Sequence, residues 1–147
     1  MGSFELGTDG PGAIVVGVDG SPTSMRAAAY AAGLARRQHT RLIAVYARST
    51  PTTLITLADH SGMAMNAVLE AQEDLVRQLR SEIDAWGADT ELIVRQGDPL
   101  SVLSEVAKQT RADAVIVGSS ASVGHRIAGS LAIRLVRCGK WPVTVVP

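Results

Sequence analysis

The fold is decided by the stretch AIVVGVDGSP at residues 13–22. Its first six residues are apolar and rich in β-branched side chains, which is typical of a short buried strand. Asp19 and Gly20 close this strand, and Ser21 followed by Pro22 predicts the N-cap and the first position of a helix. An alanine-rich helix is therefore expected from Pro22 to Gln38.

The same alternation of strand and helix continues to the last residue. We expect further strands at Arg41–Ala47, Thr90–Arg95, Ala112–Gly118 and Val143–Val146, and helices at Met63–Trp86, from Pro99 after an Asp98 N-cap, and at Ala128–Cys138. Alternation of this kind predicts an α/β fold with a doubly wound, mostly parallel sheet and helices on both faces. Residues 1–12 are expected to form a flexible tail, 13–147 a single domain, and 48–62 a loop.

Composition narrows the class of protein. Hydrophobic residues make up 46% and charged residues 19% of the 147-residue chain, which suits one globular domain. The 14 basic residues balance 14 acidic ones, so nucleic-acid binding is not expected. No apolar run is long enough to cross a membrane, and residues 1–12 are not expected to act as a signal peptide. A lone cysteine, Cys138, expected to be half-buried, suits a reducing compartment, and we expect a cytoplasmic protein.

The topology locates a site before any motif does. Ligands of doubly wound sheets bind beyond the carboxyl ends of the strands, where the strand order reverses. That places the turn at residues 19–21 beside the segment GSSASVGHRIAGS at residues 118–130. This segment suits the binding of a phosphate or polyphosphate, because it contains glycines, serines, His125 and Arg126 and is followed by a helix N-terminus. The alternative is an ordinary surface loop, since the segment matches neither the Walker A motif nor Gly-x-Gly-x-x-Gly.

Several short stretches together resemble the universal stress protein family. They are VGVDGS at 16–21, VIVGS at 115–119, the Gly-Ser pair at 129–130, and WPVTVVP at 141–147. The resemblance implies a five-stranded parallel sheet of order 3-2-1-4-5 and a dimer often formed through the last strand. It also implies, for one branch of the family, ATP binding through Gly-x2-Gly-x9-Gly followed by Ser or Thr.

The chain departs from that phosphate-loop pattern in two places. Ala121 stands where the second glycine belongs, and Gly129 arrives two residues early. Two hypotheses therefore stay open. In the first, the protein is a regulatory stress-response protein that binds an adenine nucleotide, ATP or AMP, with Mg²⁺ as a candidate companion ion. In the second, it is a dimeric interaction module that has lost nucleotide binding and acts through an unknown protein partner.

The resemblance also assigns candidate residues. Asp19 matches the acidic residue near the ribose, Val45 a backbone contact to adenine, and Gly118 and Gly129-Ser130 the ends of the phosphate loop. Each has a plainer interpretation: Asp19 as a turn residue, Val45 as core. The full nucleotide-binding set expected is Gly17, Asp19, Gly20, Ser21, Val45, Gly118, Ser119, Gly124, His125, Arg126, Gly129 and Ser130.

Catalysis is not expected beyond a weak ATPase side activity. Residues 118–122 lack the Gly-x-Ser-x-Gly elbow, and no histidine follows His125, so a serine hydrolase is disfavoured. No His/Cys/Asp cluster at ligand spacing predicts a metal site. The last strand would leave an apolar, β-branched sheet edge, which invites pairing with a second copy. We therefore expect a homodimer with Val143, Val145 and Val146 in its interface, its length limited by Pro142 and Pro147.

Overall fold

The computed structural model describes residues 12–48, 62–86, 89–119 and 130–147. In chain order its elements are β1 (Ala13–Gly17), α1 (Pro22–Gln38), β2 (Arg41–Arg48), α3 (Gly62–Ala85), β3 (Thr90–Gln96), α4 (Pro99–Thr110), β4 (Ala114–Gly118), α5 (Ser130–Cys138) and β5 (Val143–Val146).

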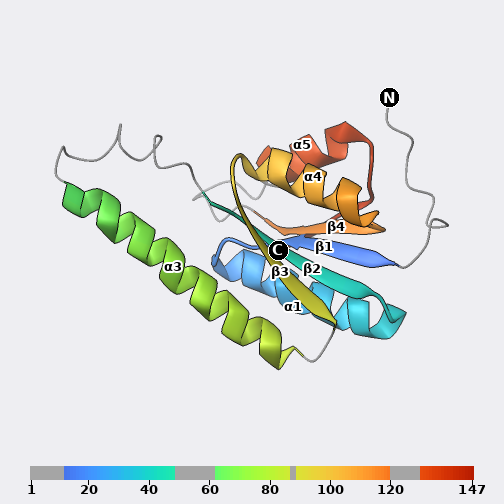
Figure 1. Ribbon diagram of the computed structural model, residues 1–147. Coiled ribbons are helices and arrows are strands. Elements are labelled where there is room, and N and C mark those ends of the chain that lie inside the picture. Colours follow the sequence, from blue (N-terminus) through green and yellow to red (C-terminus); the bar gives the residue numbers. More distant parts are fainter. Residues whose placement is uncertain (1–11, 49–61, 87–88, 120–129) are drawn as a thin grey trace.

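The molecule has three layers. The strands form one sheet in the order β3-β2-β1-β4-β5, and every neighbouring pair is parallel. Helices α1 and α3 cover one face, and α4 and α5 cover the other (Figure 1). The α/β class and the 3-2-1-4-5 order expected from the sequence are confirmed. The order reverses between β1 and β4, so the carboxyl ends of these two strands meet at the predicted switch point.

The apolar run of β1 is buried on both sides, as its sequence predicts. Ile14 and Val16 pack toward α1, whereas Ala13 and Val15 pack toward α4 and α5, and all four are at most 1% exposed. On α1 the buried positions are almost all alanine, which lets the helix axis approach the sheet closely. This close approach brings the first turn of α1 against the end of β4.

Capping confirms two of the predicted helix starts. The Ser21 side chain accepts a hydrogen bond from Ser24 N, and the Asp98 side chain accepts one from Ser101 N. The two helices end in left-handed residues that are not glycine, His39 with φ 54° and Arg111 with φ 52°. Each C-cap donates its backbone N–H to carbonyls of the preceding turn.

Some expected boundaries were wrong. β4 begins at Ala114 rather than Ala112, because Ala112 N bonds to Ala107 O and so completes the turn after α4. β2 extends one residue to Arg48, and Gly12 is already in place, accepting from Arg41 N at 3.2 Å. The rest of the expected tail and loop, and the expected helix start at residues 128–129, lie outside the described residues.

The expected burial of Cys138 was also wrong. This residue is exposed rather than half-buried, because Ala132 and Leu135 occupy the buried side of α5. None of the helices in the described part of the chain is long and apolar enough to cross a membrane.

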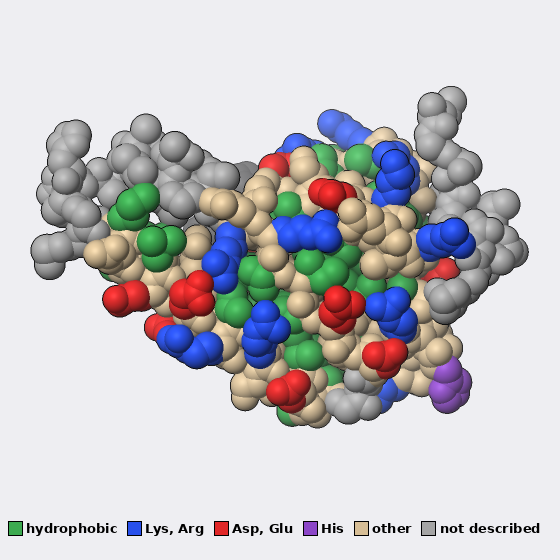
Figure 2. Space-filling model, viewed as in Figure 1, with side chains coloured by type: hydrophobic (Ala, Val, Ile, Leu, Met, Phe, Trp, Pro, Cys, Tyr) green, Lys and Arg blue, Asp and Glu red, His purple; other side chains and the backbone are tan. Residues whose placement is uncertain are grey.

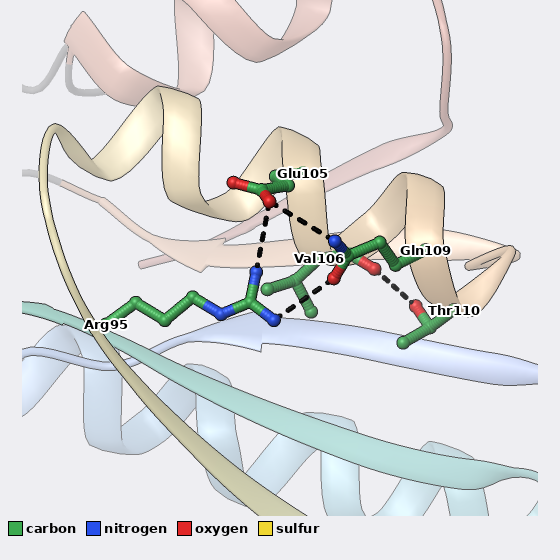
Figure 3. Close-up of polar contacts among 5 residues, drawn as sticks. All are labelled: Arg95, Glu105, Val106, Gln109 and Thr110. Atoms are coloured by element: carbon green, nitrogen blue, oxygen red, sulfur yellow. Dashed lines mark hydrogen bonds and ion pairs between the residues drawn. The ribbon is translucent and has the colours of Figure 1, made fainter.

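The two sheet edges differ in their chemistry. At the β3 edge, Arg95 lies 3.6 Å from Glu105 of α4 and donates to Gln109 Oε1 at 3.1 Å, while Gln109 donates to Glu105 (Figure 3). Arg41 also pairs with Glu91 across β2 and β3 at 3.2 Å. Figure 2 shows acidic and basic side chains interspersed over the face in view. By contrast, the β5 sequence Val-Thr-Val-Val carries no charge.

Candidate functional site

A cleft of about 310 Å³ lies at the carboxyl ends of β1, β2 and β4. It is bounded by the first turn of α1 and by the N-terminal parts of α4 and α5. Its lining residues are Gly17, Val18, Asp19, Ser21, Thr23, Ser24, Val45, Ala47, Pro99, Leu103, Val117, Gly118, Ser119, Ser130, Leu131 and Ala132.

One part of the cleft is apolar. Val45 of β2 and Val117 of β4 lie on either side of β1, and Leu103 of α4 packs over β1 at Gly17. A Cβ at position 17 would lie 3.2 Å from Leu103 Cδ1, so Gly17 leaves the room that this leucine occupies. The result is a compact hydrophobic floor beside the ends of β1 and β2.

The β1 turn forms a polar rim. Ser21 N donates to Asp19 Oδ1 at 2.8 Å, and Asp19 N donates to Ser24 Oγ at 3.2 Å. Ser24 Oγ in turn donates to Ser21 O at 3.1 Å. Burial raises the pKa of the Asp19 carboxyl, but the hydrogen bonds from Ser21 and Ser24 outweigh it and hold that pKa below its ordinary value. Asp19 is therefore a carboxylate at neutral pH.

The first turn of α1 is clamped to the end of β4. Thr23 Oγ1 donates to Ser119 O at 2.7 Å. Directly beside this bond, a Cβ at position 118 would lie 2.6 Å from Thr23 C and 2.7 Å from Ser24 N. The absence of a side chain at Gly118 is thus required by helix packing, whatever the cleft binds.

The opposite rim is built from α4 and α5. Pro99 of α4 and Ser130 and Leu131 of α5 all line the cleft on this side. Next to Pro99, Asp98 Oδ1 lies 3.6 Å from Arg134 Nη1, and both side chains are about half exposed. The backbone hydrogen bond from Ser101 lowers the pKa of Asp98, slight burial opposes it, and Arg134 lowers it further.

The structure brings together most of the predicted residues that it describes. Gly17, Asp19, Ser21, Val45, Gly118, Ser119 and Ser130 line the cleft. Gly20 does not: its φ is +82°, and a Cβ there would lie 2.7 Å from Leu75 of α3, on the other side of the turn. The remaining predicted residues, Gly124, His125, Arg126 and Gly129, lie outside the described residues.

Sequence reasoning missed several residues that shape the cleft, among them Thr23 and Leu103. Thr23 lies in the Ser-Pro-Thr-Ser run at the start of α1. The sequence shows that a hydroxyl is present there, but it does not show which group accepts its hydrogen bond. Leu103 was assigned correctly to the apolar face of α4, but nothing in the sequence shows that it covers Gly17. Within the described residues, no group of three or more His, Cys, Asp or Glu side chains is placed to hold a metal ion.

Comparison with known proteins agrees with this architecture. A model of the universal stress protein family matches residues 12–147. The chain belongs to this family. A universal stress protein of Methanocaldococcus jannaschii is 24% identical over 136 residues, which cover 90% of this chain and 80% of that relative.

Two solved universal stress protein structures are also similar. One, crystallised in complex with cAMP, is 27% identical, has a TM-score of 0.66, and covers 92% of this chain and 97% of its own. The other, from Archaeoglobus fulgidus in complex with dAMP, is 22% identical with a TM-score of 0.66, over 92% of this chain and 98% of its own. Some structural relatives of this chain therefore bind adenine nucleotides.

Proposed function

We propose that this universal stress protein is a regulatory protein that binds an adenine nucleotide, ATP or AMP, in the cleft between β1 and β4. The observation that carries the proposal is the cleft itself. Its volume of about 310 Å³ lies at the lower end of the range for small-molecule sites. It combines an apolar floor with a few polar groups at the switch point of a doubly wound sheet, where such ligands bind.

The two parts of the cleft suit the two parts of a nucleotide. The apolar floor at Val45 and Leu103 suits a flat base, which would exclude water from these side chains. The Asp19 carboxylate can accept hydrogen bonds from ribose hydroxyls. The hydroxyls of Ser119 and Ser130, with the start of α5, can donate to phosphate oxygens.

The relatives crystallised with cAMP and dAMP support the adenine part of this proposal. We propose a binding role rather than an enzymatic one, because Asp19 is the one titratable side chain among the described lining residues. Its lowered pKa makes it a weak general base. A change in the cleft walls on binding would then be read by a protein partner. The lone Cys138 suits action in the cytoplasm.

Calorimetry of nucleotide-free protein with ATP, AMP and cAMP, with and without Mg²⁺, tests the proposal. Ala47 lies half-buried in the cleft wall, so Ala47→Phe fills the space and is expected to abolish micromolar binding. Ala85→Phe, at an exposed site at the end of α3, is the matched control and should bind normally. No binding of any nucleotide up to millimolar concentration by wild-type protein would overturn the proposal and favour the dimeric interaction module without nucleotide.

We also propose that the protein forms a homodimer through β5. Val115 N donates to Pro142 O and Ser119 N donates to Val146 O, so the backbone groups of the even-numbered β5 residues face β4. Those of Val143 and Val145 consequently point to the open edge. Val146, also expected in the interface, turns its backbone carbonyl to β4.

Exposed apolar side chains flank this edge on both faces of the sheet. Tyr30 is 45% exposed and lies one turn after Arg26, which donates to Pro147 O just beyond β5. Ile133 and Val136 are 36% and 60% exposed on α5, the helix that precedes β5 in the chain and contacts it. These are three of the four exposed large hydrophobic residues among the described residues, and their grouping supports a protein contact here.

Sedimentation tests the dimer. Wild-type protein at micromolar concentration is expected at twice the chain mass of 15.4 kDa. Val136→Arg should shift it toward monomer, whereas Leu69→Arg, at the fourth exposed hydrophobic position on α3, should not. A wild-type mass of one chain would refute this proposal and leave the nucleotide proposal standing.

A further inference from the structure

The charges at the cleft indicate which rim the phosphate end of a bound nucleotide would occupy. Asp19, the ionised group on the β1 rim, would repel a phosphate placed next to it. The rim formed by Pro99 of α4 and Ser130 of α5 lies on the opposite face of the sheet from α1, the helix that this turn leads into. The phosphate end of a bound nucleotide therefore belongs on the α4 and α5 side.

Arg134 is placed to serve that end. It follows Ser130 by four residues on α5, so the two share a helix face. Helical side chains lean toward the N-terminus of their helix, which carries the guanidinium back over the Ser130 turn. Its contact with Asp98, the residue before Pro99, shows that it reaches the gap between α5 and α4 at this rim. Its head group therefore lies beside Asp98, the residue next to the Pro99 part of the rim.

The present partner of Arg134 holds it weakly. The distance of 3.6 Å to Asp98 Oδ1 is longer than a hydrogen bond, and the two side chains are 51% and 46% exposed. Exposed pairs of this kind contribute little to stability. Asp98 is also satisfied without it, because its Oδ2 accepts from both the N–H and the hydroxyl of Ser101. A phosphate offers the guanidinium a bidentate, more highly charged acceptor.

Resting on the proposed nucleotide function, we propose that Arg134 is the phosphate-binding cation of this site and that Asp98 competes with the phosphate for it. On binding, the guanidinium exchanges the Asp98 carboxylate for the phosphate at the Ser130 end of the cleft. The base and ribose contacts are made elsewhere, so Arg134 selects for the phosphate and contributes nothing to adenosine.

This exchange predicts opposite effects for the two members of one ion pair. Arg134→Gln should weaken AMP binding about fivefold, the order expected for one half-exposed charge-assisted contact, and leave adenosine binding unchanged. Asp98→Asn keeps the N-cap acceptor but frees the guanidinium, so AMP binding should tighten by about twofold or more. Arg137→Gln, another exposed arginine on α5, is the matched control and should change neither.

Calorimetric titrations of AMP and adenosine into the four proteins, each checked by thermal unfolding, decide the matter. The proposal is overturned if Arg134→Gln lowers AMP and adenosine affinity equally, if it lowers neither, or if Asp98→Asn weakens AMP binding as Arg134→Gln does. The last result would mean that the pair only braces the cleft. If the wild-type protein binds neither ligand, the proposed nucleotide function itself fails. That result differs from the three above, in which the wild-type protein binds AMP and only the role of Arg134 is refuted.

Discussion

Replacing Gly118 by alanine should destabilise the protein without any ligand present. The new Cβ would lie 2.6 Å from Thr23 C, 2.7 Å from Ser24 N and 2.7 Å from Thr23 O. All three are backbone atoms of the first turn of α1, so no side chain can rotate out of the way. Reaching an ordinary carbon–carbon separation requires α1 and β4 to move apart by roughly 0.8 Å.

The magnitude follows from what that movement disturbs. Overpacking of a well-packed site costs about 1–3 kcal/mol. A value near the middle of this range or above it applies here, because the same movement stretches the 2.7 Å bond from Thr23 to Ser119 O. With an m-value of about 2 kcal/mol/M in urea, a loss of about 2 kcal/mol lowers the midpoint by about 1 M.

Urea unfolding followed by the fluorescence of Trp86 and Trp141 measures this shift in nucleotide-free protein. Gly33→Ala is the matched control. Gly33 lies inside α1, and a Cβ there would meet only the flexible ends of Arg37, at 3.1 Å, and Arg36, at 3.9 Å. Alanine should therefore raise stability by about 0.5–1 kcal/mol through helix propensity. A Gly118→Ala midpoint equal to that of wild type would refute the packing argument and return Gly118 to a purely ligand-binding role.

Three further predictions concern the cleft walls and core. The pKa of Asp19 is lower in the folded protein than in the unfolded chain, where it is about 4, so the ionised carboxylate stabilises the fold fully above that pH and loses this effect as pH falls through the folded value. Between pH 5.5 and 3, the wild-type protein should therefore lose more free energy of unfolding than Asp19→Asn, and equal losses would contradict this. Thr23→Val removes the donor to Ser119 O and should cost about 1 kcal/mol in urea unfolding, with an unchanged midpoint counting against the clamp. Leu135→Ala empties a fully buried site on α5 and should cost about 2–5 kcal/mol by the same assay, whereas a cost below about 1 kcal/mol would mean that α5 is not packed as described.

Local signals predicted the framework of the fold well. The β1 run and the Ser21-Pro22 and Asp98-Pro99 caps act over a few residues, so the sequence contains all that they need. The helix ends at His39 and Arg111 carry no such signal. Glycine usually occupies a left-handed C-cap, and here hydrogen bonds to the preceding turn stabilise two other residues in that conformation.

The candidate site was predictable in outline but not in its contacts. Topology alone placed the β1 turn beside the end of β4. The bond between Thr23 and Ser119 joins residues 96 positions apart, and no periodicity reveals such a pair. Gly20 shows the converse case, since it lies in the turn beside the cleft without lining it, and a Cβ there would lie 2.7 Å from Leu75 of α3. The contribution of Arg134 likewise depends on where α4 and α5 meet.

The unequal sheet edges set how many copies an assembly can hold. A sheet with two open edges could add molecules at both sides and grow without limit, as fibres do. Here the Arg95, Glu105 and Gln109 network places charge along β3, while β5 remains uncharged. In the proposed dimer, pairing through β5 about a twofold axis would use the uncharged edge of each molecule and leave the two charged β3 edges outside. The proposed dimer would thus offer no second uncharged edge for strand pairing, and the proposal predicts that assembly stops at two copies.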